Sequence, residues 1–155
     1  MRARDVMSSP VITVTPDCCV KEAADLLASK GFTALPVVND DDRLIGIVTE
    51  TDVMRDQFPR HPTYRNDAHD SPLPPHRPAA TVGEVMTTSV IGMGAGTTVV
   101  DLVTAMLDDN VRAMPIVDGS RIVGIVTRRD LLRFLPNAFR SSAAEYSELQ
   151  RGGVL

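Results

Sequence analysis

Two segments carry the same pair of hydrogen-bonding side chains, a threonine followed three residues later by an aspartate. The pairs are Thr49 with Asp52 and Thr127 with Asp130, and each follows an apolar run. A carboxylate at the start of a helix can accept hydrogen bonds from two neighbouring hydroxyls, while a Thr hydroxyl and free helix N–H groups face phosphates. Aspartate is also a preferred helix-capping residue. The pattern therefore predicts two ligand sites, with two structural caps as the alternative.

The residues around the two aspartates differ in charge. Beside Asp130 the chain places three arginines, whereas the equivalent positions near Asp52 are uncharged or acidic; the pairs are Thr33 and Arg112, Glu50 and Arg128, and Thr51 and Arg129. Hydrogen bonds to phosphate are about twice as strong when the donor is charged, and arginine is suited to bidentate contact. Most arginines are solvated surface residues, which is the alternative interpretation.

These equivalences come from an internal repeat. Val6-Met7 recurs as Val85-Met86 at an offset of 79, and Gly46-Ile47-Val48-Thr49 recurs as Gly124-Ile125-Val126-Thr127 at an offset of 78. Agreement over nearly the whole of each copy indicates two related structural units.

Each unit has the pattern β-α-β-β-α. Apolar residues recur at helical spacing from Val20 and from Val99, Thr98 and Asp101 have the form of a capping box, and Cys19 with Glu22 is its weaker counterpart. Gly31 and Asn110 stand where a left-handed cap is expected. The predicted strands span residues 11–14, 35–38 and 43–49, then 90–93 and two segments around the Asp118-Gly119-Ser120 turn; short helices begin near Thr51 and Arg129. We therefore expect an α/β (α+β) fold in which two three-stranded sheets pack together.

The chain divides into four parts on this basis: a first unit at residues 1–57, a linker at 58–81, a second unit at 82–135 and a tail at 136–155. The linker is rich in proline and holds His61, His69 and His76. Its histidine spacing matches no short-range metal pattern, so a polar linker is favoured over a metal site. A short helix is expected in the tail near residues 145–149.

Both units resemble the CBS domain, named for cystathionine β-synthase, and the pair resembles a Bateman module. The resemblance covers residues 4–55 and 83–133. It is carried by the two Val-Met pairs and by the following segments: Ala34-Leu35-Pro36-Val37-Val38, Gly46-Ile47-Val48-Thr49-Glu50-Thr51-Asp52, Ala113-Met114-Pro115-Ile116-Val117 and Gly124-Ile125-Val126-Thr127-Arg128-Arg129-Asp130.

The resemblance implies a regulatory module that binds AMP, ADP, ATP or S-adenosylmethionine in clefts between the units and assembles as a flat homodimer. It implies no required cofactor. Clefts of this family combine both units. The expected ligand residues are therefore Thr127, Arg129, Asp130 and Arg112 with Thr33 and Ala34 in one cleft, and Thr49, Thr51 and Asp52 with Val111 and Ala113 in the other. We expect the Asp130 cleft to take the phosphorylated ligand. The Asp52 cleft is expected to bind weakly or to prefer a less charged adenosine compound.

Composition bears on other classes of protein. The formal net charge of −4 and the absence of Trp argue against nucleic-acid binding, and no apolar run approaches the ~20 residues of a membrane span. Adjacent Cys18 and Cys19 suit a reducing cytoplasm, and a thiolate sensor at the helix start is weighed against plain substitution for the equivalent Thr97-Thr98. Gly92–Gly96 lacks the spacing of a phosphate loop and is interpreted as a flexible connection.

No residue pattern supports an enzyme. Neither unit contains histidine, and the recurrent aspartate of each unit, Asp52 or Asp130, is not accompanied by a second catalytic group. The expected output is contact with a separate, unidentified protein. The alternative is a structural dimerisation module whose ligand sites are vestigial.

Overall fold

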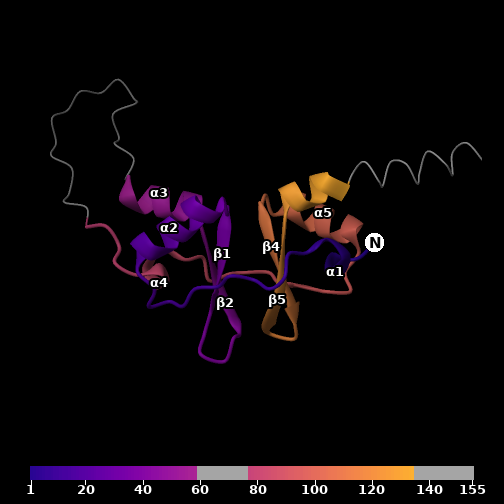
Figure 1. Cartoon of the computed structure of the whole chain (residues 1–155), viewed down its shortest axis with the longest axis horizontal. Coiled ribbons are helices and arrows are strands. Elements are labelled where there is room, and N and C mark those ends of the chain that lie inside the picture. The colour runs from indigo at the N-terminus through magenta and orange to yellow at the C-terminus, as the bar shows by residue number, and fades with distance from the viewer. Residues whose placement is uncertain (59–76, 135–155) are drawn as a thin grey trace, which may run out of the picture.

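A computed structural model describes residues 1–58 and 77–134. Two small sheets meet near the middle of the molecule, and helices cover their outer sides (Figure 1). The first half contains α2 (Val20–Lys30), β1 (Ala34–Val38), β2 (Leu44–Thr49) and α3 (Glu50–Gln57). The second contains β3 (Met93–Gly94), α5 (Val99–Asp108), β4 (Ala113–Asp118), β5 (Arg121–Thr127) and a helix whose described part spans residues 128–134. The predicted α/β architecture is confirmed.

The helix ends follow the sequence signals at three positions of four. Gly31 and Asn110 both have a positive φ, 64° and 51°, so the left-handed caps are confirmed. The Thr98 hydroxyl accepts a hydrogen bond from the Asp101 N–H at 3.2 Å. The predicted cap at Cys19 is wrong, because its side chain makes no capping hydrogen bond. A thiol is a weak acceptor, and Glu22 instead accepts a hydrogen bond from the Cys18 thiol.

Both units contain a hairpin at the predicted turn. β1 and β2 are antiparallel with Ala34 opposite Thr49, and β4 and β5 repeat this with Ala113 opposite Thr127. The strand predicted at residues 11–14 is wrong in extent, because it is reduced to one parallel bridge between Val14 and Val37. Its counterpart β3 forms a pair of only two residues with β4.

The segments that precede each unit pack into the opposite half. The short helix α1 (Ala3–Val6) buries its two apolar end residues in the core of the second half, against Leu102 and Met106. The helix α4 (Val82–Val85) buries Val82 in the core of the first half. Figure 1 shows indigo α1 beside α5, and α4 beneath α2. The two halves are therefore joined by an exchange of their N-terminal helices.

Backbone hydrogen bonds continue this exchange. Thr87 and Ile47 bond each other in both directions at 2.9 and 3.0 Å, and Ser8 and Ile125 do so at 2.9 and 3.1 Å. These bonds tie residues 8 and 87 to the edges of β5 and β2. They hold the segments that follow them, residues 9–12 and 88–91, beside the junction of the two halves.

A methionine–glycine contact accompanies each exchanged segment. A Cβ added to Gly46 would lie 2.7 Å from the Met86 sulfur, and one added to Gly124 would collide with the Met7 sulfur. Each repeated Val-Met pair therefore packs on the repeated glycine of the other unit, which explains why both motifs recur.

No helix within residues 1–58 and 77–134 is long and apolar enough to cross a membrane. The three linker histidines and the helix predicted near residues 145–149 lie outside the described residues. The division into parts at residues 57, 81 and 135 stays a prediction.

Candidate functional site

Thr49 and Asp52 form a closed hydrogen-bonded pair at the start of α3. The Asp52 Oδ2 atom accepts from the Thr49 N–H at 2.8 Å and from its hydroxyl at 2.7 Å, while the Asp52 N–H donates to the Thr49 oxygen at 3.2 Å. This is a capping box with Thr49, rather than the aspartate, as the N-cap. The Oδ1 atom of Asp52 makes no hydrogen bond within the described parts of the chain, so capping leaves one carboxylate oxygen available.

Thr127 and Asp130 repeat this geometry at the end of β5. Asp130 Oδ2 accepts from the Thr127 N–H at 2.9 Å and from its hydroxyl at 2.6 Å. The Oδ1 atom lies 3.8 Å from a guanidinium nitrogen of Arg133, and the Asp130 side chain is 14% exposed. Capping therefore uses one oxygen of the Asp130 carboxylate and leaves the other beside Arg133.

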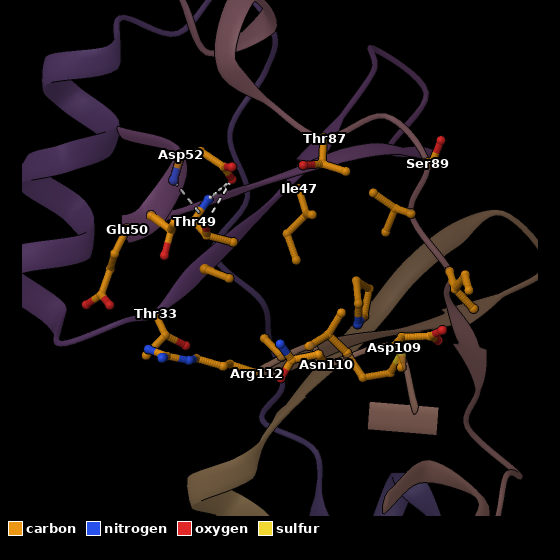
Figure 2. Close-up of a pocket in the computed structure, with 18 of the residues that line it drawn as sticks. Thr33, Ile47, Thr49, Glu50, Asp52, Thr87, Ser89, Asp109, Asn110 and Arg112 are labelled. Carbon is orange, nitrogen blue, oxygen red and sulfur yellow. Dashed lines mark hydrogen bonds between the residues drawn. The ribbon is translucent and has the colours of Figure 1, made fainter. Parts of the chain in front are cut away.

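A cavity of about 660 Å³ lies beside Asp52, here named the Asp52 cavity. It combines Thr49, Thr51 and Asp52 of the first unit with Val111 and Ala113 of the second, as well as with four residues of the segment after Met86: Thr87, Ser89, Val90 and Ile91. Figure 2 shows Asp52 and Thr49 on one side, Asp109, Asn110 and Arg112 opposite, and Thr87 and Ser89 at a third wall. The structure thus brings together all five residues expected in this cleft.

A second cavity of about 470 Å³, the Asp130 cavity, lies on the other side of the junction. It contains the whole set expected for the other cleft: Thr33, Ala34, Arg112, Thr127, Arg129 and Asp130. Each cavity therefore joins the Thr-x-x-Asp segment of one unit to the start of the first hairpin strand, β1 or β4, of the other.

The two segments after the Val-Met pairs are cavity walls that sequence patterns did not identify. Ile12 lines the Asp130 cavity and is 42% exposed, and Ile91 lines the Asp52 cavity and is 58% exposed. The repeat offers a signal for them, since Ile12 and Ile91 are equivalent positions. Both fall in segments that the apolar pattern predicts to be strands. An exposed isoleucine at a cavity provides an apolar surface for a flat ligand group.

Arg112 and Arg128 line the Asp130 cavity, where they were expected, and both also line the Asp52 cavity. Arg128 is committed to the end of α5: its Nε donates to the Val111 carbonyl at 3.0 Å, and Nη2 lies 3.4 Å from the Met106 carbonyl. Arginine at a helix C-terminus satisfies carbonyls that have no partner in the helix. Arg128 is thus held in place by structural hydrogen bonds.

The charge difference between the cavities is nevertheless present in the structure. The Asp130 cavity is lined by one acidic residue and by five basic ones: Lys30, Arg112, Arg128, Arg129 and Arg133. The Asp52 cavity has three of each sign: Glu50, Asp52 and Asp109 against Arg55, Arg112 and Arg128. Lys30, Arg55 and Arg133 were missed as site residues, although Arg55 and Arg133 stand one helical turn after the two aspartates.

Two further sequence features have other roles. Burial raises the pKa of the Cys18 thiol, and the hydrogen bond to Glu22 raises it further, which opposes a thiolate sensor at that residue. Gly92–Gly96, interpreted from sequence as a flexible connection, contains the strand β3. Its Gly96 carbonyl also accepts a hydrogen bond from the Arg2 guanidinium at 2.7 Å. Among the described residues, no group of three or more His, Cys, Asp or Glu side chains is placed to hold a metal.

Known proteins are similar to this chain in sequence and in fold. The chain is similar to Hypoxic response protein 1 of Mycobacterium tuberculosis, with 31% identity over 134 residues that cover 86% of this chain and 85% of that protein. The CBS domain pair of protein MJ0100, solved with 5′-methylthioadenosine and S-adenosyl-L-methionine, superposes with a TM-score of 0.73 at 27% identity, covering 89% of this chain and 98% of that one.

Hypoxic Response Protein I has also been solved, with two coordinated zinc ions, and gives a TM-score of 0.66 at 27% identity, covering 86% of this chain and 98% of that one. The family model described as CBS domain matches residues 3–58 and 82–137. This chain belongs to the CBS domain family and contains a tandem pair of these domains.

Proposed function

We propose that this chain is a regulatory module that binds an adenosine-containing ligand between its two CBS domains. One observation carries the proposal: two cavities stand at equivalent positions, and each combines a Thr-x-x-Asp segment with residues of the other domain. Their volumes of about 660 and 470 Å³ fall in the usual range of small-molecule sites, roughly 300–1,000 Å³.

The walls match the three parts of a nucleotide. The exposed face of Ile12 or Ile91 is suited to a purine ring. The Oδ1 atoms of Asp52 and Asp130 are placed to accept hydrogen bonds from ribose hydroxyls, and the basic side chains suit phosphates. The domain pair of MJ0100 supports the ligand class, since its structure contains two adenosine compounds.

The charge difference supports a division of ligands between the two cavities according to ligand charge. We propose that the Asp130 cavity takes the phosphorylated ligand, because five basic residues line it and only one acidic residue opposes them. Calorimetry with AMP on Asp130→Ala and Asp52→Ala tests this. The expected result is a larger loss of affinity in Asp130→Ala, and equal losses would contradict the division.

A structural dimerisation module without ligands is the second candidate. Exposed apolar side chains on the helices, and at the residue that follows α3, favour an interface between copies: Met54, Phe58, Val100, Leu107 and Leu132. Dimerisation also fits the proposed regulatory role, in which ligand binding changes dimer shape or contacts with another protein.

Thermal shift distinguishes the two candidates. A ligand that binds only the folded chain stabilises it by about 2.7 kcal/mol at a concentration 100 times its Kd. AMP, ATP or S-adenosylmethionine is expected to raise the unfolding midpoint. No shift with any of them at millimolar concentration would favour the purely structural role.

A further inference from the structure

The two cavities share a wall at the junction of the domains. Thr33, Ala34, Arg112 and Arg128 line both. Thr33 and Arg112 are equivalent positions of the repeat, so each domain contributes the same piece of chain to the shared wall. One of these equivalent side chains is neutral and the other is cationic.

Arg112 and Arg128 are the two cations of this wall, and they differ in the hydrogen bonds of their side chains. The Arg112 side chain is exposed and makes no hydrogen bond or ion pair within residues 1–58 and 77–134, whereas Arg128 is held by carbonyls of Met106 and Val111. Figure 2 shows Arg112 extending beside Thr33, toward the side of the cavity where α3 begins at Glu50. The guanidinium is therefore able to turn toward either cavity.

Apart from Arg112 and Arg128, each basic side chain around the cavities lines only one of them. Arg55 lines only the Asp52 cavity, and Lys30, Arg129 and Arg133 line only the Asp130 cavity. Thr33 offers no substitute charge, and its hydroxyl oxygen is buried with no hydrogen-bond partner in the described part of the chain.

We propose that Arg112 is a phosphate ligand shared by the two cavities, so that a phosphorylated ligand in one weakens the binding of a second phosphorylated ligand in the other. This inference rests on the proposed adenosine-binding function. One guanidinium carries one positive charge, and a phosphate that has drawn it leaves the other cavity without it. The two phosphates also repel each other across the wall. A ligand without phosphate does not compete for Arg112, so the pair of cavities favours one nucleotide together with one uncharged adenosine compound.

Calorimetry tests the coupling by measuring the affinity of the Asp52 cavity for AMP when the Asp130 cavity is filled and when it is empty. In the wild type, the weaker of the two binding events reports the Asp52 cavity beside a filled Asp130 cavity. In Asp130→Ala, the titration reports the Asp52 cavity beside an empty one. Since coupling between sites is typically about 5–150-fold, AMP is expected to bind at least roughly fivefold more tightly to the Asp52 cavity in Asp130→Ala. Adenosine, used as the uncharged probe, is expected to show no such difference.

The same comparison on an Arg112→Thr background, which restores the residue of the equivalent position, is expected to abolish the difference. Arg121→Ala is the matched control, because Arg121 is 69% exposed, pairs with Asp42 and lines neither cavity. Asp130→Asn, which keeps an oxygen for the helix cap, replaces Asp130→Ala if the latter does not fold.

The outcomes separate the two proposals. Independent AMP affinities in the wild type, positive coupling, or coupling that persists in Arg112→Thr would overturn the shared-ligand inference and leave adenosine binding intact. Failure of wild-type protein to bind AMP and adenosine would overturn both.

Discussion

At the scale of single residues, Asp52 and Asp130 take part in helix caps and still offer a second oxygen for the ligand role that we propose, so the two interpretations of the sequence are compatible. One carboxylate oxygen closes the capping box with the preceding threonine, and the other makes no hydrogen bond among the described residues at Asp52 and lies 3.8 Å from Arg133 at Asp130. The cap fixes the carboxylate before any ligand arrives, and a fixed acceptor loses less entropy on binding. The threonine is therefore a positioning residue for the aspartate.

Thr127→Val tests the structural part of this role. The substitution keeps the side-chain shape but removes the hydroxyl that bonds both the Asp130 carboxylate and its N–H. Loss of an N-cap costs about 0.5–2 kcal/mol, and a decrease of that size is expected in the free energy of unfolding measured in urea. Thr88→Val, at an exposed threonine outside any helix, is the control. Equal stability of the two variants would contradict the cap.

Sequence patterns located the aspartates and threonines because both recur at fixed spacing. They placed Arg112 and Arg128 beside Asp130 but did not show that both also line the Asp52 cavity, since a charge count along the chain does not reveal which carbonyls or which cavities an arginine reaches. Arg128 donates a hydrogen bond to the Val111 carbonyl just after α5, and Arg112 lines both cavities.

At the scale of elements, the capping box of α4 holds an exchanged segment in place. Glu84 accepts hydrogen bonds from the Thr81 N–H at 2.8 Å, the Thr81 hydroxyl at 3.1 Å and the Ala80 N–H at 2.9 Å. These donors, the Thr81 N–H foremost, lower the pKa of Glu84 from its ordinary value of 4.5.

The lowered pKa gives a stability contribution with a defined sign. The folded state favours the ionised carboxylate, so the contribution is present above pH 4.5 and is lost as the pH falls below it, through the folded-state pKa. Urea unfolding at a series of pH values is expected to show a constant difference between wild type and Glu84→Ala near neutrality that shrinks in acid. Asp17→Ala, at an exposed carboxylate, is the control. A difference that grows as the pH falls would contradict the assignment.

The hairpins and long helices were predictable from sequence because their signals are local: helical spacing, left-handed caps and turn residues. The first strand of each unit was not, because an apolar run of four residues has the same appearance whether it pairs or not. Val14 joins the sheet by a single bridge, whereas the residues before it line the Asp130 cavity.

At the scale of the whole molecule, the exchange of N-terminal segments makes the two domains interdependent. The internal repeat aligns the Val-Met pair of one domain with that of the other. This alignment does not reveal that each pair packs against the other domain. The methionine–glycine contacts supply the reason, since Met7 packs on Gly124 and Met86 on Gly46.

Gly124→Ala tests the importance of this exchange. The added methyl group would collide with the Met7 side chain, and overpacking of this kind costs typically about 1–3 kcal/mol. Gly94→Ala is the matched control, because its nearest neighbour would be the Thr97 hydroxyl at 3.9 Å. Denaturant unfolding is expected to show a clear loss of stability only in Gly124→Ala. A loss of the same size in both variants would indicate that contact with Met7 is unimportant.

The position of the cavities between domains also belongs to this scale. The family resemblance predicted which residues of one domain meet the aspartate of the other, and the structure brings those residues together. The shared wall was beyond sequence analysis, because it depends on how closely Thr33 and Arg112 approach the junction from opposite domains.

The most direct test of adenosine binding between the domains is a calorimetric titration of AMP and S-adenosylmethionine into wild-type protein and into the double variant Asp52→Ala with Asp130→Ala. Since hydrogen bonds to a charged group contribute about 1.5–3 kcal/mol, the account predicts saturable binding to the wild type and an affinity at least roughly tenfold lower in the folded double variant. No binding of either compound to the wild type, or equal affinities in the two proteins, would contradict it.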